Sequence, residues 1–187
     1  LAQRPLTGYL DATWGDGGVA LLPLLLAWRA AIRAKVLGFS VAKGADASAA
    51  GEVAAARDYL ERAIAYLDPP PACLVALGGV SGTGKSTLAR DLAPELGPAP
   101  GAVVLRSDAV RKRLHGVAPA DRLPPAAYRK EASRPVYDAL AERAAVLLRA
   151  GHAAVVDAVF LDPAERAQLP AGRIPLQRTT LYRDASE

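Results

Sequence analysis

The glycine-rich stretch at residues 79–86 constrains the fold more than any other part of the sequence. It reads Gly-Val-Ser-Gly-Thr-Gly-Lys-Ser and matches the pattern G-x-x-x-x-G-K-S/T at every fixed position. An apolar run at residues 73–77 precedes it, as a buried strand would, and residues 86–92 have the character of the first turns of a helix. A strand, a glycine loop and a helix in this order predict a loop whose backbone N–H groups surround a phosphate.

The residue types within this stretch match the needs of phosphate binding. Gly79, Gly82 and Gly84 allow the backbone to turn around one anion. Lys85 brings a mobile positive charge to the outer phosphates, and Ser86 offers a hydroxyl to a magnesium ion. The alternative is a glycine-rich turn that binds nothing, but the complete pattern and both flanking segments favour a phosphate-binding loop.

Composition and charge narrow the class of protein. Hydrophobic residues make up 51% of the 187 residues, enough for a substantial core in one or two domains. The net charge of +4 is not gathered in one tail, so charge alone does not indicate a nucleic-acid-binding protein. The single cysteine, Cys73, excludes an intramolecular disulfide framework and suits a reducing cytoplasm. The strongest apolar run, residues 19–28, is too short to cross a bilayer, so we expect a cytoplasmic protein without a membrane partner.

Residues 1–71 are expected to form a mostly helical segment. Residues 1–17 have few periodic apolar positions and predict an irregular lead-in, whereas residues 18–39 and 48–67 have helical patterns. The second of these helices carries four apolar residues on one face, namely Val53, Leu60, Ile64 and Leu67. Prolines at positions 69–71 end this helix and mark the expected domain boundary.

An alternation of strands and helices begins at residue 72. Strand patterns lie at residues 73–77, 102–105 and 153–156, and a further strand is expected within residues 173–182. Helical patterns lie at residues 109–114 and 128–149 and after the Asp-Pro pair at 162–163. This order predicts an α/β domain over residues 72–187, with a parallel sheet covered by helices.

Polar residues stand at the ends of the predicted strands. The first strand leads into the glycine loop, the second into Arg-Ser-Asp at residues 106–108, and the third into Asp157. In an open parallel sheet, ligands bind beyond the carboxyl ends of the strands. We therefore expect the loop, Asp108 and Asp157 to meet in one crevice.

Asp108 is the candidate general base. Opposite a bound triphosphate, its carboxylate would accept a proton from a substrate hydroxyl. Arg111, three residues later, should share its helical face and would steady transferred charge or bind an anionic substrate. The alternative is that Ser107 or Asp108 only caps the helix and that Arg111 is solvated.

Asp157 is the candidate second magnesium residue. It would hold the ion through a water, alongside Ser86, although an aspartate at a strand end is also a common turn residue. We expect Lys112 and Arg113 to lie on a solvated helix face. No metal-binding cluster is evident from the spacing of the ligand-type residues, and surface or capping roles are expected for both histidines, His115 and His152.

Three segments resemble the small P-loop kinases: residues 78–87, 105–114 and 151–160. That group includes gluconate kinase, the polynucleotide 5′-kinase domain, chloramphenicol phosphotransferase and zeta toxin. The resemblance is strongest to the ATP-binding half of bacterial bifunctional aminoglycoside phosphotransferase/ATP-binding proteins. Residues 18–36 resemble the last helices of the phosphotransferase-like domain that precedes this half, so residues 1–71 are expected to be the end of such a domain.

The resemblance implies a P-loop NTPase-type fold that uses ATP and Mg²⁺. It implies that Asp108 activates a hydroxyl with Arg111 nearby, and that Arg183 lies at the edge of a lid where it meets the phosphates. Because the family continues through a lid helix, we expect the domain at residues 72–187 to be incomplete at its C-terminus. The residues assigned to nucleotide binding are Gly79, Ser81, Gly82, Thr83, Gly84, Lys85, Ser86, Thr87 and Arg183.

Three functions are compatible with these observations. The first is an ATP-dependent kinase that phosphorylates a hydroxyl of a small molecule, with Lys85, Asp108 and Arg111 as catalytic residues. The second is a polynucleotide 5′-hydroxyl kinase, which the modest net charge does not favour. The third is a non-catalytic ATP-binding module that regulates a fused phosphotransferase. The sequence leaves the identity of the acceptor open.

Overall fold

The computed structural model describes residues 3–43, 49–160, 163–169 and 180–182. The chain divides into two compact units. One is Ala20–Pro70, and the other combines Leu1–Val19 with Pro71–Glu187. This division differs from the expected helical segment at residues 1–71, because the first 19 residues belong to the unit that contains the sheet.

The smaller unit is a helical hairpin of α2 (Leu22–Lys43) and α3 (Ala49–Leu67), which confirms the two predicted helices. Pro23 is the second residue of α2, within the first turn, where proline is tolerated. Among the residues of these helices whose burial is described, the buried apolar ones are alanines, Ala27, Ala30 and Ala63. The face predicted for α3 is instead exposed: Leu60, Ile64 and Leu67 are 52–63% accessible. Among the described helices, none has the length and apolarity needed to cross a membrane.

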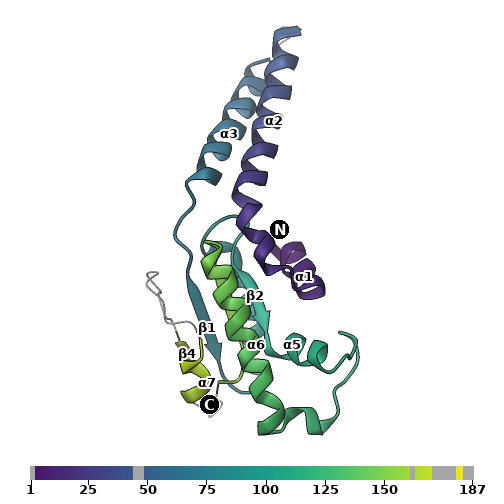
Figure 1. Cartoon of the computed structure of the whole chain (residues 1–187). Helices are drawn as coiled ribbons and strands as arrows, with labels where there is room; N and C mark the ends of the chain where they lie inside the picture. The colour runs from purple at the N-terminus through teal and green to yellow at the C-terminus, as the bar shows by residue number, and fades with distance from the viewer. Residues whose placement is uncertain (1–2, 44–48, 161–162, 170–179, 183–187) are drawn as a thin grey trace. The chain divides into compact units, whose positions relative to one another are not determined.

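The larger unit is built on a parallel sheet, as predicted (Figure 1). The strands are β1 (Leu74–Gly78), β2 (Val103–Arg106), β3 (Ala154–Asp157) and β4 (Thr180–Tyr182), in the order β2-β3-β1-β4. The first three begin one residue later than the sequence pattern predicts. The register places Leu77 and Arg106 opposite Asp157, so the carboxyl ends of three strands are level.

Helices cover both faces of this sheet. Helix α4 (Lys85–Leu92) and the 3₁₀ turn Ala93–Glu95 pack on one face, against apolar side chains such as Val75, Val104 and Val155. Side chains alternate along a strand, so the neighbouring positions point to the opposite face. There α6 (Lys130–Arg149) packs along β2 and β3 (Figure 1). Its fully buried residues include Val136, Leu140, Ala144 and Leu147.

Three short helices complete the larger unit. Helix α5 (Ser107–Leu114) follows β2 without a loop, the 3₁₀ turn Pro125–Tyr128 precedes α6, and α7 (Pro163–Ala167) follows β3. Helix α6 begins two residues after the predicted start and includes Pro135. Because α5 begins at Ser107, Asp108 lies in its first turn rather than in a loop ahead of the helix.

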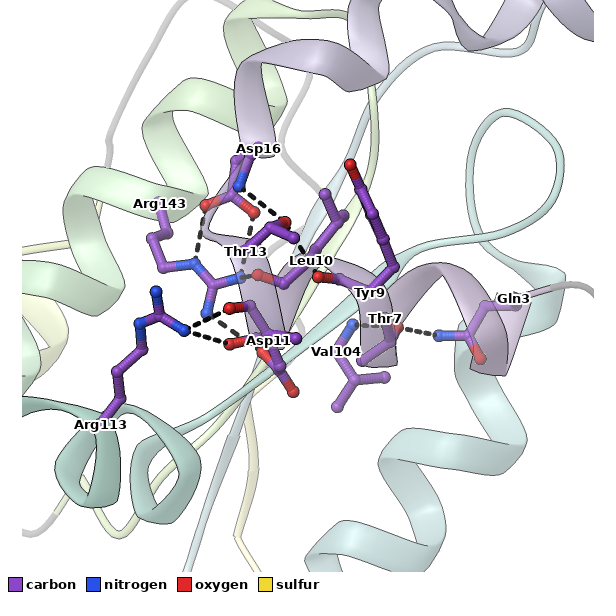
Figure 2. Close-up of polar contacts among 12 residues, drawn as sticks. Gln3, Thr7, Tyr9, Leu10, Asp11, Thr13, Asp16, Val104, Arg113 and Arg143 are labelled. Carbon is purple, nitrogen blue, oxygen red and sulfur yellow. Dashed lines mark hydrogen bonds and ion pairs between the residues drawn. The ribbon is translucent and has the colours of Figure 1, made fainter. Parts of the chain in front are cut away.

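Residues 3–13 form a helix, α1 (Gln3–Thr13), where the sequence predicts an irregular segment. The helix lies along β2, which is an edge strand of the sheet. The amide of Gln3 donates to the Ala102 carbonyl (2.8 Å), and the Val104 N–H donates to Thr7 Oγ1 (3.4 Å; Figure 2). These bonds satisfy backbone groups that an edge strand would otherwise leave unpaired.

A buried arginine of α6 fixes the end of α1 (Figure 2). Arg143 contacts both carboxylate oxygens of Asp16, at 2.7 and 3.0 Å, and Asp11 Oδ1 at 3.1 Å. Burial acts to lower the pKa of Arg143, but the hydrogen bonds and charges of the two aspartates outweigh it and raise that pKa. Burial also raises the pKa of Asp11, against the opposing charge of Arg143. The first 19 residues are thus part of the larger unit through specific polar contacts.

Candidate active site

The glycine loop has the conformation that its sequence predicts. Gly82 and Gly84 adopt φ values of 88° and 81°, a region that residues with a Cβ rarely enter. A Cβ at either position would meet no atom within 4 Å, so backbone conformation rather than lack of space requires glycine. Gly84 is also the N-cap of α4, which leaves the first N–H groups of that helix free of a side-chain cap.

Lys85 is the first residue of α4, and its side chain lies along the loop. Its Nζ donates to the Val80 carbonyl at 2.6 Å, and Thr83 Oγ1 donates to the same carbonyl at 2.9 Å. The ammonium group of Lys85 is therefore held beside the glycine loop, close to the N-terminus of α4. A full positive charge and free N–H groups at one place make a binding site for an anion.

Ser86 and Asp157 meet as the sequence predicts. Ser86 Oγ donates to Asp157 Oδ2 at 2.5 Å, and Arg106 Nε lies 3.9 Å from the same oxygen. Asp157 is 6% exposed at the end of β3. Two adjacent oxygen ligands suit Mg²⁺, which usually takes one or two protein oxygens together with waters and substrate phosphates. Within the described ranges there is no cluster of three or more His, Cys, Asp or Glu that could hold a metal ion.

One cleft of about 650 Å³ joins these groups, and we call it the phosphate cleft. Ser81, Gly82 and residues 84–87 of the loop line this cleft. Gly79 and Thr83, which were also predicted to bind the nucleotide, are not among the lining residues. The N–H of Gly79 donates instead to the Val159 carbonyl, which ties the loop to the chain after β3. The lining also includes Asp108, Arg111 and Asp157, so the predicted candidates of three strand ends do share one crevice. Arg183 lies outside the described residues.

Asp108 has different neighbours from those predicted. Its Oδ1 accepts a hydrogen bond from the Tyr128 hydroxyl at 3.4 Å, and its Oδ2 lies 3.4 Å from Lys112 Nζ. Helix α5 has no side-chain cap, so the alternative in which Ser107 or Asp108 only caps the helix is not observed. The carboxylate is 43% exposed and lines the phosphate cleft.

Arg111 is a buried residue rather than the direct partner of Asp108. It is 7% exposed and donates to the Ala127 carbonyl (2.6 Å) and to Ser133 Oγ (3.2 Å). Its guanidinium also lies 5.1 Å from the centre of the Tyr128 ring. The prediction that Arg111 stands beside Asp108 is therefore replaced by an indirect relation: Arg111 holds the turn that carries Tyr128, and Tyr128 contacts Asp108.

Two further basic residues make contacts that the sequence does not predict, although Arg113 is exposed as predicted and Lys112 is half-buried. Lys112 pairs with Asp108 and donates to the Pro119 carbonyl at 2.9 Å. Arg113 donates to the carbonyls of Asp11 and Ala12 at the end of α1. Asp108 and Lys112 are four residues apart, which is a typical spacing of ion pairs on a helix, so this contact could have been predicted from the sequence. The contact between Arg113 and α1 joins residues about 100 apart, so no local pattern could reveal it.

Comparison with known families identifies the domain. The sequence profile of a family described as an AAA domain matches residues 74–186. The chain belongs to this AAA domain family. The match spans the glycine loop, Asp108 and Asp157, and it agrees with the P-loop NTPase-type α/β fold of the larger unit. As a member of the AAA domain family, the chain contains a nucleotide-binding domain of the kind found in P-loop kinases.

Curated relatives extend the similarity beyond this domain. Uncharacterized proteins of Mycobacterium bovis and of Mycobacterium tuberculosis, strains CDC 1551 and H37Rv, are each 33% identical over 166 residues. The alignment covers 87% of this chain but 32% of each relative. The chain thus spans about a third of the length of the curated relatives it matches.

Proposed function

We propose that the protein is an ATP-dependent kinase that transfers the γ-phosphoryl group to a hydroxyl of a small molecule. One observation carries this proposal: the carboxylate of Asp108 lies in the same cleft as the glycine loop, Ser86 and Asp157. A cleft that only binds nucleotide does not need a half-exposed carboxylate facing the phosphate loop. Membership of the AAA domain family supports the nucleotide-binding part of the proposal.

Residues of the loop and of α4 would bind the triphosphate of ATP. The backbone N–H groups from Gly82 to Ser86 would bind the phosphates, and Lys85 would exchange its contact with the Val80 carbonyl for the β- and γ-phosphates. Ser86 and Asp157 would hold Mg²⁺, which neutralises phosphate charge when bound. Arg106, 46% exposed near Asp157, is placed to add positive charge to the same region.

Asp108 would act as the general base in the transfer. The acceptor hydroxyl gives its proton to a carboxylate oxygen of Asp108, while the hydroxyl oxygen forms a bond to the γ-phosphorus. The bond between that phosphorus and the β–γ bridging oxygen breaks, and its electron pair leaves with ADP. Tyr128 and Lys112 hold the two carboxylate oxygens in position through the contacts described above. General-base catalysis of this kind contributes about 10²–10⁴-fold to a rate.

A transfer assay with Asp108→Asn tests the proposal. The protein is incubated with [γ-³²P]ATP and a panel of sugars, polyols, aminoglycosides and 5′-hydroxyl oligonucleotides, and labelled products are separated. With the acceptor that the wild type uses, Asp108→Asn should lower kcat by about 10²-fold or more. Its affinity for ATP should stay within about twofold, because the loop residues are unchanged. Asp138→Asn, at an exposed position of α6, is the matched control and should leave kcat unchanged.

The other outcomes of this assay separate the alternatives. Full transfer by Asp108→Asn would show that the carboxylate is not the base and would contradict the proposal. Transfer to oligonucleotides alone would identify a polynucleotide 5′-hydroxyl kinase. Tight ATP binding by the wild type without transfer to any acceptor would identify an ATP-binding regulatory module.

A further inference from the structure

A second cavity, of about 600 Å³, lies between α1 and α5, and we call it the α1/α5 cavity. Its α1 side is formed by Gly8, Asp11 and Ala12, and its other side by α5 and the turn that follows. Pockets for small ligands have volumes of about 300–1,000 Å³. The family match begins at residue 74, so α1 is not part of the AAA domain that this cavity adjoins.

Asp108 stands where the α1/α5 cavity meets the phosphate cleft. It lines both, as Arg106 does. Its two oxygens face different sides: Oδ1 contacts Tyr128, which lines the phosphate cleft, and Oδ2 contacts Lys112, which lines the α1/α5 cavity. A molecule in the α1/α5 cavity can therefore present a hydroxyl to the carboxylate that also faces the phosphate loop.

Among the charged residues that line the α1/α5 cavity, Arg113 has no ion pair within the described part of the chain. The charged lining residues are Asp11, Arg106, Asp108, Lys112 and Arg113. Four of them are in ion pairs, with distances of 3.1–3.9 Å. In the described part of the chain, Arg113 contacts two neutral backbone carbonyls (Figure 2). Its guanidinium also lies 5.2 Å from the centre of the Trp14 ring. These contacts hold the guanidinium but do not cancel its charge.

We infer that the α1/α5 cavity binds the phosphoryl acceptor, and that the acceptor is a small polyhydroxylated molecule with one anionic group; this inference rests on the proposed kinase function. The anionic group lies at Arg113, whose planar guanidinium suits a carboxylate. A hydroxyl of the same molecule lies at Asp108. An aminated sugar would place a cation beside Arg113 and is disfavoured.

Three sugars built on the same glucose ring, one anionic, one neutral and one cationic, test the charge preference. Equilibrium dialysis with ¹⁴C-labelled D-glucuronate, D-glucose and D-glucosamine gives a Kd for each on the whole chain. The expected order of affinity is glucuronate, then glucose, then glucosamine, with at least a tenfold difference between the first and the last. Arg113→Gln should remove most of this difference. Equal binding of all three, or no binding of any, would overturn the inference.

Filling the cavity tests its location. Gly8 lines the cavity, and a Cβ added there meets no atom within 4 Å, so Gly8→Trp is chosen to place an indole ring in the cavity. It should weaken glucuronate binding at least tenfold and leave ATP affinity unchanged. Gly38→Trp, at an equally open helical glycine that lines neither cavity, is the matched control and should retain binding. Glucuronate binding that survives Gly8→Trp would overturn the inference.

The transfer assay distinguishes this inference from the kinase proposal. Label transfer that is equal in the wild type and in Gly8→Trp would leave the kinase proposal intact and reject the α1/α5 cavity as the acceptor site. Glucuronate binding that is sensitive to Gly8→Trp but is never followed by transfer would reject the kinase proposal and retain the cavity as a ligand site.

Discussion

Arg111 and Asp108 show what residue spacing can and cannot predict. Their separation of three residues predicts that they share one face of a helix, and both do lie in helix α5. The direction of the Arg111 side chain is set by the Ala127 carbonyl and Ser133, which are 16 and 22 residues away. Ser86 and Asp157 were predictable because a sequence motif and the topology of parallel strands fix their positions. No comparable rule predicts which side chains meet when loops of irregular length separate them.

Arg111→Leu should act first on stability. The substitution leaves the buried Ala127 carbonyl without its charged donor, which costs about 1–3 kcal/mol in the free energy of unfolding. Urea unfolding followed by Trp14 fluorescence in a Trp28→Phe background measures this, because Trp14 belongs to the larger unit and Trp28 to the hairpin. An unchanged free energy together with a large loss of kcat would show instead that Arg111 acts directly on the reactants.

Asp16→Ala should be strongly destabilising. Asp16 and Arg143 form an ion pair in which both side chains are 5% exposed. Removal of Asp16 leaves the buried guanidinium with Asp11, 3.1 Å away, as its carboxylate partner. The expected cost is therefore at most the value of about 3–5 kcal/mol that breaking a buried ion pair costs. Asp138→Ala, at an exposed position of α6, should change the free energy of unfolding by less than about 0.5 kcal/mol in the same Trp14 assay. Similar values for the two variants would show that the buried pair does not hold α1.

His152 is buried, contrary to the predicted surface role, while its backbone N–H donates to the Leu147 carbonyl at the end of α6. We expect it to make stability depend on pH. It is 1% exposed, and its Nε2 lies 3.1 Å from the Gly101 carbonyl, so the neutral ring donates from Nε2. Burial lowers its pKa below 6.5 in the folded protein. The unfolded chain then binds the proton more readily, so stability is lost as pH falls below 6.5 toward the folded pKa. His152→Gln should lose less stability than the wild type between pH 7.5 and 5.5. An identical loss in both would exclude His152 as the cause.

At the scale of elements, the first three strands were predictable to within one residue, but α1 was not. Pro5 and Gly8 give residues 3–13 a weak helical propensity, and the helix is stabilised by tertiary contacts instead. Leu10 is 1% exposed, and Gln3 and Thr7 bond to the edge of β2. A sequence pattern reports the preference of a segment alone, so it missed a helix that exists because of the strand beside it.

Thr7→Val should loosen the contact between α1 and β2. The substitution keeps the shape of the side chain but removes the oxygen that accepts from the Val104 N–H. We expect a loss of about 0.5–1.5 kcal/mol in the free energy of unfolding and faster hydrogen exchange at the Val104 amide. Thr13→Val is the control, because its hydroxyl bonds to the Tyr9 carbonyl within α1 and is exposed. Unchanged exchange at Val104 in Thr7→Val would show that the edge of β2 is protected by other contacts.

At the scale of the whole chain, the hairpin of α2 and α3 departs most from the pattern of a buried core. Where burial is described, its buried apolar residues are alanines, which let two helices approach closely, while many larger apolar side chains are exposed. On α2 these include Trp28, Ile32 and Val36, which are 67%, 47% and 57% exposed and are spaced four residues apart on one face. Helical periodicity locates such a face, but it does not say whether the face is covered.

Replacing Trp28, Ile32 and Val36 with glutamine should therefore lower the apolar surface of this chain without unfolding the hairpin. Exposed apolar patches bind the dye ANS and promote self-association, so ANS fluorescence and light scattering should both fall. Helicity by circular dichroism should be retained, because glutamine is a better helix former than the residues replaced. The matched control replaces Arg29, Arg33 and Lys35, which are also exposed on α2, with glutamine and should leave ANS fluorescence unchanged. Loss of helicity in the first variant alone would contradict the prediction, because it would show that these side chains stabilise the hairpin although they are exposed.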